Sequence, residues 1–393
     1  MGKKRKRTNK RGGMSNLQIS LDNVEAAFRE GKKMGLTVVK ETFREESYSS
    51  YEKTVKTMIR DLSKLPGVDE KRVLPKYMNG ETWDRYFDHL EERYANGTLA
   101  ASTISKRVHA LEAFRQMVNG TNVCGKDSKI RVGDKYERLE GLKDRGVLRS
   151  KDNITAMKPS HDQVSLVHSN INTRTKNGQM ALIVNQFQYG TGGRIKSVFK
   201  LEVRDIDFEK GRITFRNDKN NHTRVVPMTS GARDILKSAI AGKSAGSKVF
   251  GMKREDGREM AIGLKVKTIQ TYTNAAAKRA GIYRDDRRYT THSNRKGYAQ
   301  NLYDSTRNMT KKELDKLIGD YTKSQGSNRE QVVQRMKNEL DRINTYRIKN
   351  GMDKKPFSQE QLRRMLVSLH LGHSRLDVVL SYISPDPLTR SRA

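Results

Sequence analysis

Two stretches of helical periodicity are separated by a segment with no periodicity, and this break constrains the fold more than any other feature. Between Gly120 and Lys158 the apolar pattern stops and the chain fills with glycine and charged residues, as in "GKDSKIRVGDKYERLEGLKDRGVLRSKDN". A segment of this composition cannot bury a core, so we place a domain boundary near residues 140–158. The length of 393 residues suits two domains or more.

The residues before the break predict a helical domain over 36–150, with its linker. In "YEKTVKTMIRDL" the apolar residues from Val55 to Leu62 form one helical stripe, and "STISKRVHALEAFRQMV" repeats the pattern. Three cations of this second helix fall largely off its apolar face and are candidate DNA contacts: Lys106, Arg107 and Arg115. An ordinary charged helix surface is the alternative for all three.

The first 35 residues are predicted to form a basic, mobile N-terminal arm. The first 13, "MGKKRKRTNKRGG", carry seven lysines or arginines and end in two glycines, a composition that forms no core. The arm is interpreted as a phosphate-binding segment, a solubilising tail or a nuclear import signal, and the sequence leaves these three open.

Charge and cysteine usage narrow the function classes. Lys+Arg 79 against Asp+Glu 45 gives a formal charge of +34, a positive field that attracts a polyanion, so nucleic acid is the first expected partner. Cys124 is the single cysteine, which excludes an internal disulfide and a Cys₂His₂ zinc site within one chain. No run of about 18 apolar residues occurs, so we expect no membrane partner.

The residues after the break predict a catalytic domain over 151–393. "GQMALIVNQFQYGTGGRIKSVFKL" is its most apolar segment, and "GRITFRNDKNNHTRVVPM" alternates apolar and polar residues as a β-hairpin does, with Lys219 at the tip. A charged, helix-compatible stretch over 308–355 is interpreted as an insertion of surface helices. The predicted fold class is mainly α with a small antiparallel β-sheet.

Four patches of this domain carry residues suited to chemistry. They are "GTGGRIKSVFKLEVRDID", "KNNHTRVVP", "HSNR" and "LHLGHSRLDVVLSY", and they contain Arg194, Lys219, His292, Arg295, His373 and Tyr382. In the last patch the helix is expected to end at Gly372 in a left-handed conformation, with Tyr382 nine residues after His373. The order and spacing of the patches resemble the tyrosine recombinase (phage integrase) family.

The resemblance implies a helical core-binding domain followed by an α+β tyrosine-recombinase catalytic domain. It implies a site-specific DNA recombinase that cleaves and rejoins strands through a 3′-phosphotyrosine intermediate, for integration, excision or transposition of a mobile element. The implied partners are a double-stranded recombination site, a homotetramer on two duplexes and accessory DNA-bending proteins. No metal and no other cofactor is implied, and the implied location is the nucleoid in the cytoplasm of a bacterium, an archaeon or a phage-infected host.

Elementary chemistry gives each of the six residues a role. Arg194 and Arg295 offer permanently charged planar forks to phosphate oxygens, and His373 adds a donor. A tyrosine hydroxyl, with a pKa of about 10, needs a base or a cationic pocket before it attacks, so Tyr382 is the nucleophile and His292 its proton acceptor or positioner. The flexible ammonium of Lys219 suits delivery of a proton to the leaving 5′ oxygen.

The sequence also departs from the family and leaves alternatives. Ser197 stands where the family usually has a glutamate three residues after the first arginine, and 77 residues separate Arg295 from His373, far more than usual. For individual residues the alternatives are a core or capping histidine, a rim tyrosine, arginines that position phosphate without catalysis, and Lys196 or Lys200 in place of Lys219. For the whole chain they are a type IB topoisomerase or a noncatalytic DNA-binding protein.

Overall fold

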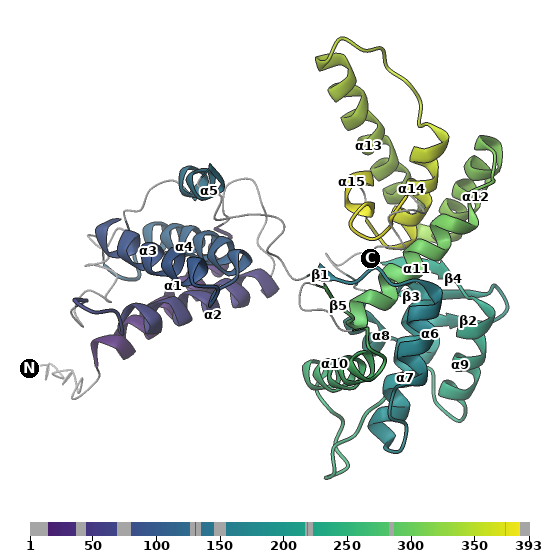
Figure 1. Cartoon of the computed structure of the whole chain (residues 1–393), viewed down its shortest axis with the longest axis horizontal. Coiled ribbons are helices and arrows are strands. Elements are labelled where there is room, and N and C mark those ends of the chain that lie inside the picture. The colour runs from purple at the N-terminus through teal and green to yellow at the C-terminus, as the bar shows by residue number, and fades with distance from the viewer. Residues whose placement is uncertain are drawn as a thin grey trace, which may run out of the picture. The chain divides into compact units, whose positions relative to one another are not determined.

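The computed structural model describes residues 15–36, 45–68, 80–125, 130, 135–144, 155–216, 218, 223–282, 287–373 and 375–385. The chain divides into two compact units, Met1–Asn153 and Ile154–Ala393 (Figure 1). Each unit has a hydrophobic core of its own. The division lies within the predicted boundary near 140–158.

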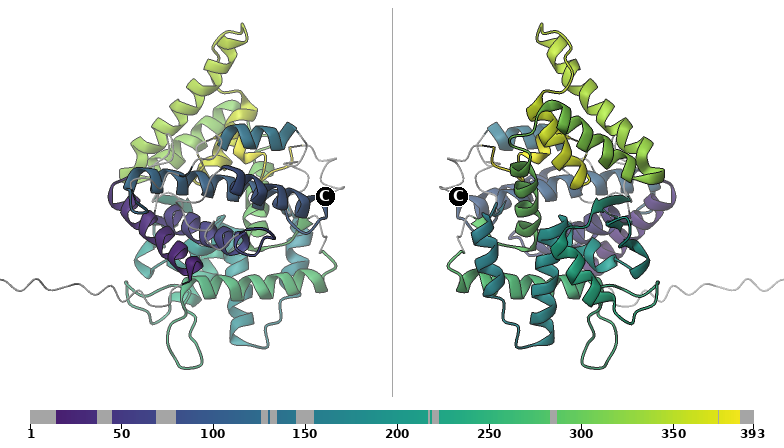
Figure 2. Two further views of the ribbon diagram at one scale, coloured as in Figure 1. Left: turned by 90° about the vertical axis from the view of Figure 1, so that its left-hand side faces the viewer. Right: turned by 90° about the vertical axis from the view of Figure 1, so that its right-hand side faces the viewer.

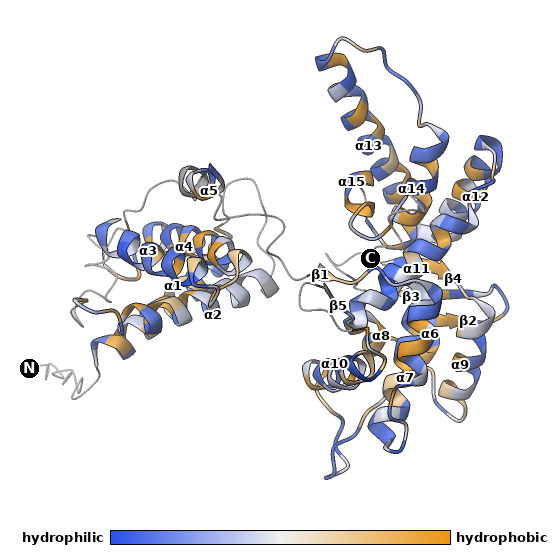
Figure 3. Cartoon of the chain, in the orientation of Figure 1, coloured by the Kyte–Doolittle hydropathy of each residue, from blue (hydrophilic) through white to orange (hydrophobic). Residues whose placement is uncertain are grey.

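The described residues of the N-terminal unit form helices joined by turns. Its core gathers large aromatic side chains, among them Phe28, Trp83, Tyr86 and Phe114, and the apolar sides of the helices meet there (Figure 3). The helices are α1 (Asn16–Lys33), α2 (Glu45–Leu62), α3 (Gly80–Ala95), α4 (Ala101–Thr121) and α5 (Lys135–Asp144).

The prediction of a mobile arm over residues 1–35 is wrong for α1. This helix begins after Ser15, whose side chain accepts a hydrogen bond from the backbone N–H of Gln18 at 3.2 Å. It buries Leu21, Val24 and Phe28 in the core, because these residues recur at helical spacing behind the basic run. Residues 1–14 lie outside the described residues.

The C-terminal unit combines helices with two small sheets. A three-stranded antiparallel sheet has the order β2-β3-β4, and β1 pairs with β5 in parallel. This confirms the predicted mainly α fold with a small antiparallel sheet; the parallel pair was not predicted. The strands are β1 (Thr155–Ala156), β2 (Ile206–Asp207), β3 (Arg212–Phe215), β4 (Arg224–Pro227) and β5 (Arg287–Arg288).

The helices of this unit surround the sheet and continue beyond it. Up to residue 305 they are α6 (His161–Ser169), α7 (Lys176–Thr191), α8 (Ile195–Lys200), the 3₁₀ helix η4 (Val203–Asp205), α9 (Ser230–Ile240), α10 (Ile262–Arg279) and α11 (Thr291–Ser305). Beyond residue 305 they are α12 (Lys311–Ser324), the 3₁₀ helix η6 (Gly326–Asn328), α13 (Arg329–Lys349), α14 (Gln359–His370) and α15 (Leu376–Val379).

The predicted hairpin and the predicted insertion helices are both present. β3 and β4 pair with Phe215 opposite Arg224, and the tip residue Lys219 lies outside the described residues. Within the stretch 308–355, α12 and α13 bury Leu314 and Val332 in a core shared with α14. The far end of α13 extends beyond the rest of the unit (Figure 2). No helix in the described part of the chain is long and apolar enough to cross a membrane.

Candidate active site

Two left-handed glycines build the floor of the candidate site. Gly192 caps the end of α7 with φ +63, and Gly372 follows α14 with φ +64, as predicted for Gly372. A side chain at either position would collide with the site, because a Cβ at 192 would lie 2.5 Å from Tyr298 and one at 372 would lie 2.9 Å from Arg224. The two turns bring the carbonyl groups of Gly192 and Leu371 to the same place.

Arg295 bridges these two turns. It comes from the buried face of α11, and its Nη1 and Nη2 groups donate hydrogen bonds to the carbonyl oxygens of Gly192 and Leu371. The whole side chain is buried, yet no group in the described residues accepts a hydrogen bond from its Nε. Since buried donors are normally satisfied, this N–H is available to an acceptor that enters the site.

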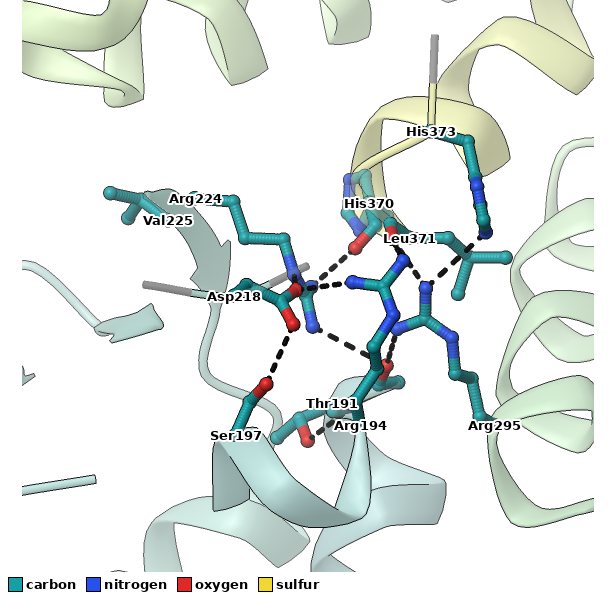
Figure 4. A network of polar contacts seen from close by, with 12 residues as sticks. Thr191, Arg194, Ser197, Asp218, Arg224, Val225, Arg295, His370, Leu371 and His373 are labelled. Carbon is teal, nitrogen blue, oxygen red and sulfur yellow. Dashed lines mark hydrogen bonds and ion pairs between the residues drawn. The ribbon is translucent and has the colours of Figure 1, made fainter. Parts of the chain in front are cut away.

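Two further arginines lie beside Arg295 and share a carboxylate (Figure 4). Arg194, which precedes α8, donates to Asp218 at 2.5 Å, and Arg224 of β4 donates to the same carboxylate oxygen at 2.8 Å. Ser197 of α8 donates to the other oxygen of Asp218 at 2.6 Å. The network therefore joins α8, the hairpin and, through Leu371, the end of α14.

The site carries an excess of positive charge. Burial by itself would raise the pKa of Asp218, but Arg224 and Arg194 outweigh it and hold this pKa well below its usual range. Burial, followed by repulsion from Arg194 and Arg224, lowers the pKa of Arg295. Three guanidinium groups thus share the charge of one carboxylate among the described residues, an arrangement that favours binding of an additional anion.

Tyr382 lies against this cluster from the C-terminal side. Its ring centroid is 5.1 Å from that of His373 and 5.4 Å from that of His292, and the guanidinium carbon of Arg295 lies 5.7 Å from it. The tyrosine is 7% exposed. Lys158 donates to the carbonyl groups of Leu380 and Ile383, at 2.7 and 2.8 Å, on either side of it. The residues around Tyr382, which we call the tyrosine segment, are therefore held by hydrogen bonds from the same chain.

The two predicted histidines differ in their surroundings. Partial burial and the charges of Arg295, Lys296 and Arg194 lower the pKa of His292 to about 4, although the residue is exposed to solvent. This histidine is thus neutral at neutral pH. His373 follows Gly372, and its Nε2 lies 3.4 Å from Nη2 of Arg295. Because arginine can only donate, Nε2 of His373 is the acceptor in this arrangement.

Helices of the stretch 308–355 contact two of the segments that build the site. At the end of α12, Gln325 pairs with both backbone groups of Val225, at 3.0 and 2.9 Å, beside Arg224. From α13, the buried Glu339 accepts the backbone N–H of Leu376 at 2.8 Å, at the start of the helix that leads to Tyr382. The stretch 308–355, whose role the sequence does not indicate, thus contacts the hairpin and the tyrosine segment.

Of the six predicted catalytic residues, five meet in this site: Arg194, His292, Arg295, His373 and Tyr382. The sixth, Lys219, lies outside the described residues, so its role stays a prediction. His370, three residues before His373, is buried, and its Nδ1 forms a hydrogen bond with the hydroxyl of Tyr298 at 2.7 Å. No group of three or more metal-ligating side chains occurs within the described ranges.

The expectation that Arg107 points away from the apolar face of its helix is wrong. Arg107 is buried in the N-terminal unit, where it forms an ion pair with Asp61 at 2.9 Å and donates to the hydroxyl of Tyr86. Arg115 is half-buried and paired with Glu112, whereas Lys106 is exposed. Contact of these cations with DNA stays a prediction, and Lys106 is the most accessible of the three.

Sequence reasoning missed Asp218 and Arg224. A signal was present for Arg224, because the alternation of "HTRVVP" places it on the inward side of the strand with Val226, where an unpaired cation is costly. Asp218 sits in the polar hairpin tip, and its contact with Ser197 over 21 positions has no signature in spacing.

Comparison with known proteins agrees with this geometry. Residues 160–320 match the model of the phage integrase family, so the match covers the first arginine motif, the hairpin and the "HSNR" motif. The C-terminal unit therefore contains a region of the phage integrase (tyrosine recombinase) family. The match ends within α12, inside the stretch 308–355.

A curated relative matches over a short segment. The chain is 38% identical to tyrosine recombinase XerA of Saccharolobus solfataricus over 63 residues, which are 16% of this chain and 22% of that protein. Among solved structures, the Tn1549 transposon integrase in complex with transposon right end DNA has a TM-score of 0.52 at 11% identity, covering 96% of this chain and 98% of that one. Its complex with a circular intermediate DNA gives 0.51 at 12%, covering 97% and 98%. These two likenesses show the fold.

Proposed function

We propose that this protein is a site-specific tyrosine recombinase that cleaves and rejoins DNA strands through a 3′-phosphotyrosine at Tyr382. The observation that carries the proposal is the placement of the Tyr382 ring 5.7 Å from Arg295, which belongs to a cluster of three guanidinium groups. Arg194, Arg224 and Arg295 leave more positive charge in the site than Asp218 neutralises. A phosphodiester supplies the missing negative charge, and it gains more as the transition state forms.

The proposal assigns one residue to each step of the reaction. The hydroxyl of Tyr382 attacks phosphorus, and the bond from phosphorus to the 5′ oxygen breaks. His292 accepts the phenolic proton; it is neutral before DNA binds, and the negative phosphate makes it a better base by opposing the surrounding cations. Lys219 gives its proton to the departing 5′ oxygen. Attack by another 5′ hydroxyl reverses the sequence, so no bond energy is lost to water.

The proposed substrate is double-stranded DNA. The Tn1549 integrase was solved with transposon end DNA and with circular intermediate DNA, and we extend a mobile-element DNA substrate to this chain. The formal charge of +34 supports the same partner. A homotetramer on two duplexes, accessory DNA-bending proteins and a nucleoid location are further parts of the proposal.

A covalent-trapping experiment tests the proposal without knowledge of the target site. The full chain is mixed with random-sequence duplexes that contain nicks, so that a short cleaved fragment diffuses away and the protein stays attached. Adducts are recovered under denaturing conditions, their DNA is sequenced and the modified peptide is mapped. We expect adducts at Tyr382 that share a common sequence, and none from Tyr382→Phe.

Other outcomes decide against it. Adducts without a common sequence, together with relaxation of supercoiled plasmid, would indicate a type IB topoisomerase. Salt-dependent binding with no adduct from any duplex would leave a noncatalytic DNA-binding protein. Adducts that persist in Tyr382→Phe would show that the nucleophile is a different residue.

A further inference from the structure

We infer that Asp218 is a positioning residue for the reaction: it aligns Arg194 and Arg224 toward the scissile phosphate, and Ser197 holds it in place. The inference rests on the proposed function. It starts from the observation that the two guanidinium groups contact the same oxygen of Asp218, at 2.5 and 2.8 Å. The carboxylate comes from the hairpin, whereas Arg194 comes from the turn between α7 and α8.

The Asp218 carboxylate is held more firmly than the carboxylate of a simple ion pair. The other Asp218 oxygen accepts the hydroxyl of Ser197 at 2.6 Å, so both oxygens are held and the carboxylate cannot rotate (Figure 4). Asp218 is buried, with its side chain 2% exposed, and Arg224 is 5% exposed, which keeps solvent from screening the pair. Together with the carbonyl groups that these arginines also contact, the carboxylate therefore fixes the direction of two of the three guanidinium groups.

Charge balance gives the same residue a second effect. Without Asp218, Arg194, Arg224 and Arg295 would face one another with no anion between them in the free protein. Repulsion would then separate the groups, or a ground-state anion would occupy the gap. A site that binds the substrate phosphate more strongly before reaction does not gain rate from that binding. By neutralising part of the positive charge, Asp218 therefore limits binding of the ground-state phosphate and leaves the cluster complementary to the additional negative charge of the transition state.

A substitution of Ser197 provides the decisive test, because Ser197 contacts the oxygen of Asp218 that the two arginines do not contact. A glutamate at 197 would enter the position of the Asp218 carboxylate from α8. In the wild type this adds a second carboxylate within about 3 Å of the first, and two such groups cannot both stay ionised without cost. In a chain that lacks the Asp218 carboxylate, the same glutamate would replace it. The one substitution should thus have opposite effects in the two backgrounds.

The experiment measures adduct formation and DNA affinity on a trapping duplex selected with the wild-type protein. We expect Asp218→Asn to slow adduct formation at saturating DNA by roughly 10- to 100-fold, as for other partners that orient a contact residue. Its DNA affinity should stay equal or become tighter. Adding Ser197→Glu should restore most of the lost rate, whereas Ser197→Glu alone should slow the wild type.

Controls separate positioning from general stability. Glu259→Gln removes a carboxylate that pairs with the buried Lys265 elsewhere in this unit, and it should lower the melting temperature without changing the adduct rate. If Asp218→Asn does not fold, Ser197→Ala keeps the charge but frees the carboxylate, and a loss of about 3- to 10-fold is expected.

The outcomes distinguish this inference from the proposed function. Adduct formation by Asp218→Asn at the wild-type rate would overturn the role of Asp218 and leave the recombinase proposal intact. A slow Asp218→Asn that Ser197→Glu slows further would also overturn the role, since the carboxylate would then act through folding. No adduct from the wild type would overturn the proposed function, and this role with it.

Discussion

Buried arginines occur in both units, and they are balanced differently. In the N-terminal unit Arg107 pairs with Asp61 at 2.9 Å and contacts the hydroxyl of Tyr86, so one cation has one carboxylate. In the C-terminal unit two guanidinium groups, those of Arg194 and Arg224, share Asp218, and Arg295 beside them donates to backbone carbonyls. A balanced pair leaves no net charge to attract a ligand, whereas an unbalanced cluster is complementary to an additional anion.

The comparison shows why a cation cannot be assigned to DNA binding from its residue type alone. Arg107 lies in a helix with other cations and resembles a DNA contact in sequence, yet its charge is already neutralised inside the protein. Arg224 resembles a strand residue, yet it completes the candidate anion site. Whether an arginine is available to bind an anion depends on the balance of charge around it, and this balance is known only from the three-dimensional structure.

The largest effect is expected at Arg295, on the unbalanced side. Arg295→Lys keeps the charge but offers a single ammonium where two Nη groups now contact Gly192 and Leu371, so the turns lose their bridge. We expect adduct formation to slow by about 10²- to 10³-fold, as when one donor to a developing oxyanion is lost. Quenched-flow trapping at saturating DNA measures it.

A matched substitution sharpens that result. Arg233→Lys changes an arginine of α9 that donates to the carbonyl of Phe208 away from the cluster, and it should leave the adduct rate unchanged. Equal slowing by both substitutions would remove the distinction between the cluster and other arginines of this unit.

A smaller effect, a loss of stability, is expected when Arg107 of the balanced pair in the N-terminal unit is replaced. Arg107→Ala removes the cation that pairs with Asp61 and donates to Tyr86, so these two groups keep only each other in a mostly buried position, which should cost about 2 kcal/mol of unfolding free energy. Urea unfolding of the full chain measures this cost. At saturating DNA the rate of adduct formation should stay within about twofold of wild type, because the contact belongs to the core.

Lys106→Ala provides the contrast on the same helix. Lys106 is exposed, so its loss should leave stability unchanged. If Arg107→Ala instead weakened DNA binding while stability stayed at the wild-type value, the balanced pair would be a DNA contact after all.

The sequence predicts much of the catalytic unit because its signals are local. A glycine must end α14 before His373, and alternation over a polar tip predicts the β3-β4 hairpin; both are present. The spacing of "HSNR" places His292 and Arg295 on adjacent turns of one helix, and both reach the site. Local rules of this kind need no knowledge of the rest of the chain.

The remaining features depend on contacts between distant segments. Asp218 meets Ser197 because the hairpin folds over α8, and Gln325 meets Val225 across 100 positions. No period in the sequence encodes such pairs. The prediction of an arm over residues 1–35 missed α1, because the apolar stripe of this helix is short and follows a run of basic residues. Burial of Arg107 has the same origin, since Asp61 and Tyr86 come from two other helices.

The smallest expected effect concerns pH and follows from the same unbalanced charge. Partial burial, followed by the surrounding cations, lowers the pKa of His292 to about 4, so this residue is neutral both at pH 8 and at pH 5.5. If neutral His292 accepts the proton of Tyr382, adduct formation at subsaturating DNA should show no titration near 6.5 and should fall in acid with a midpoint near 4. The rates are compared at pH values where the melting temperature shows a folded protein. His292→Gln should be slower at every pH and lose the acid fall. A wild-type midpoint near 6.5 would mean that the free enzyme holds His292 as an ordinary exposed histidine, and that the cluster does not govern its nearest titrating neighbour.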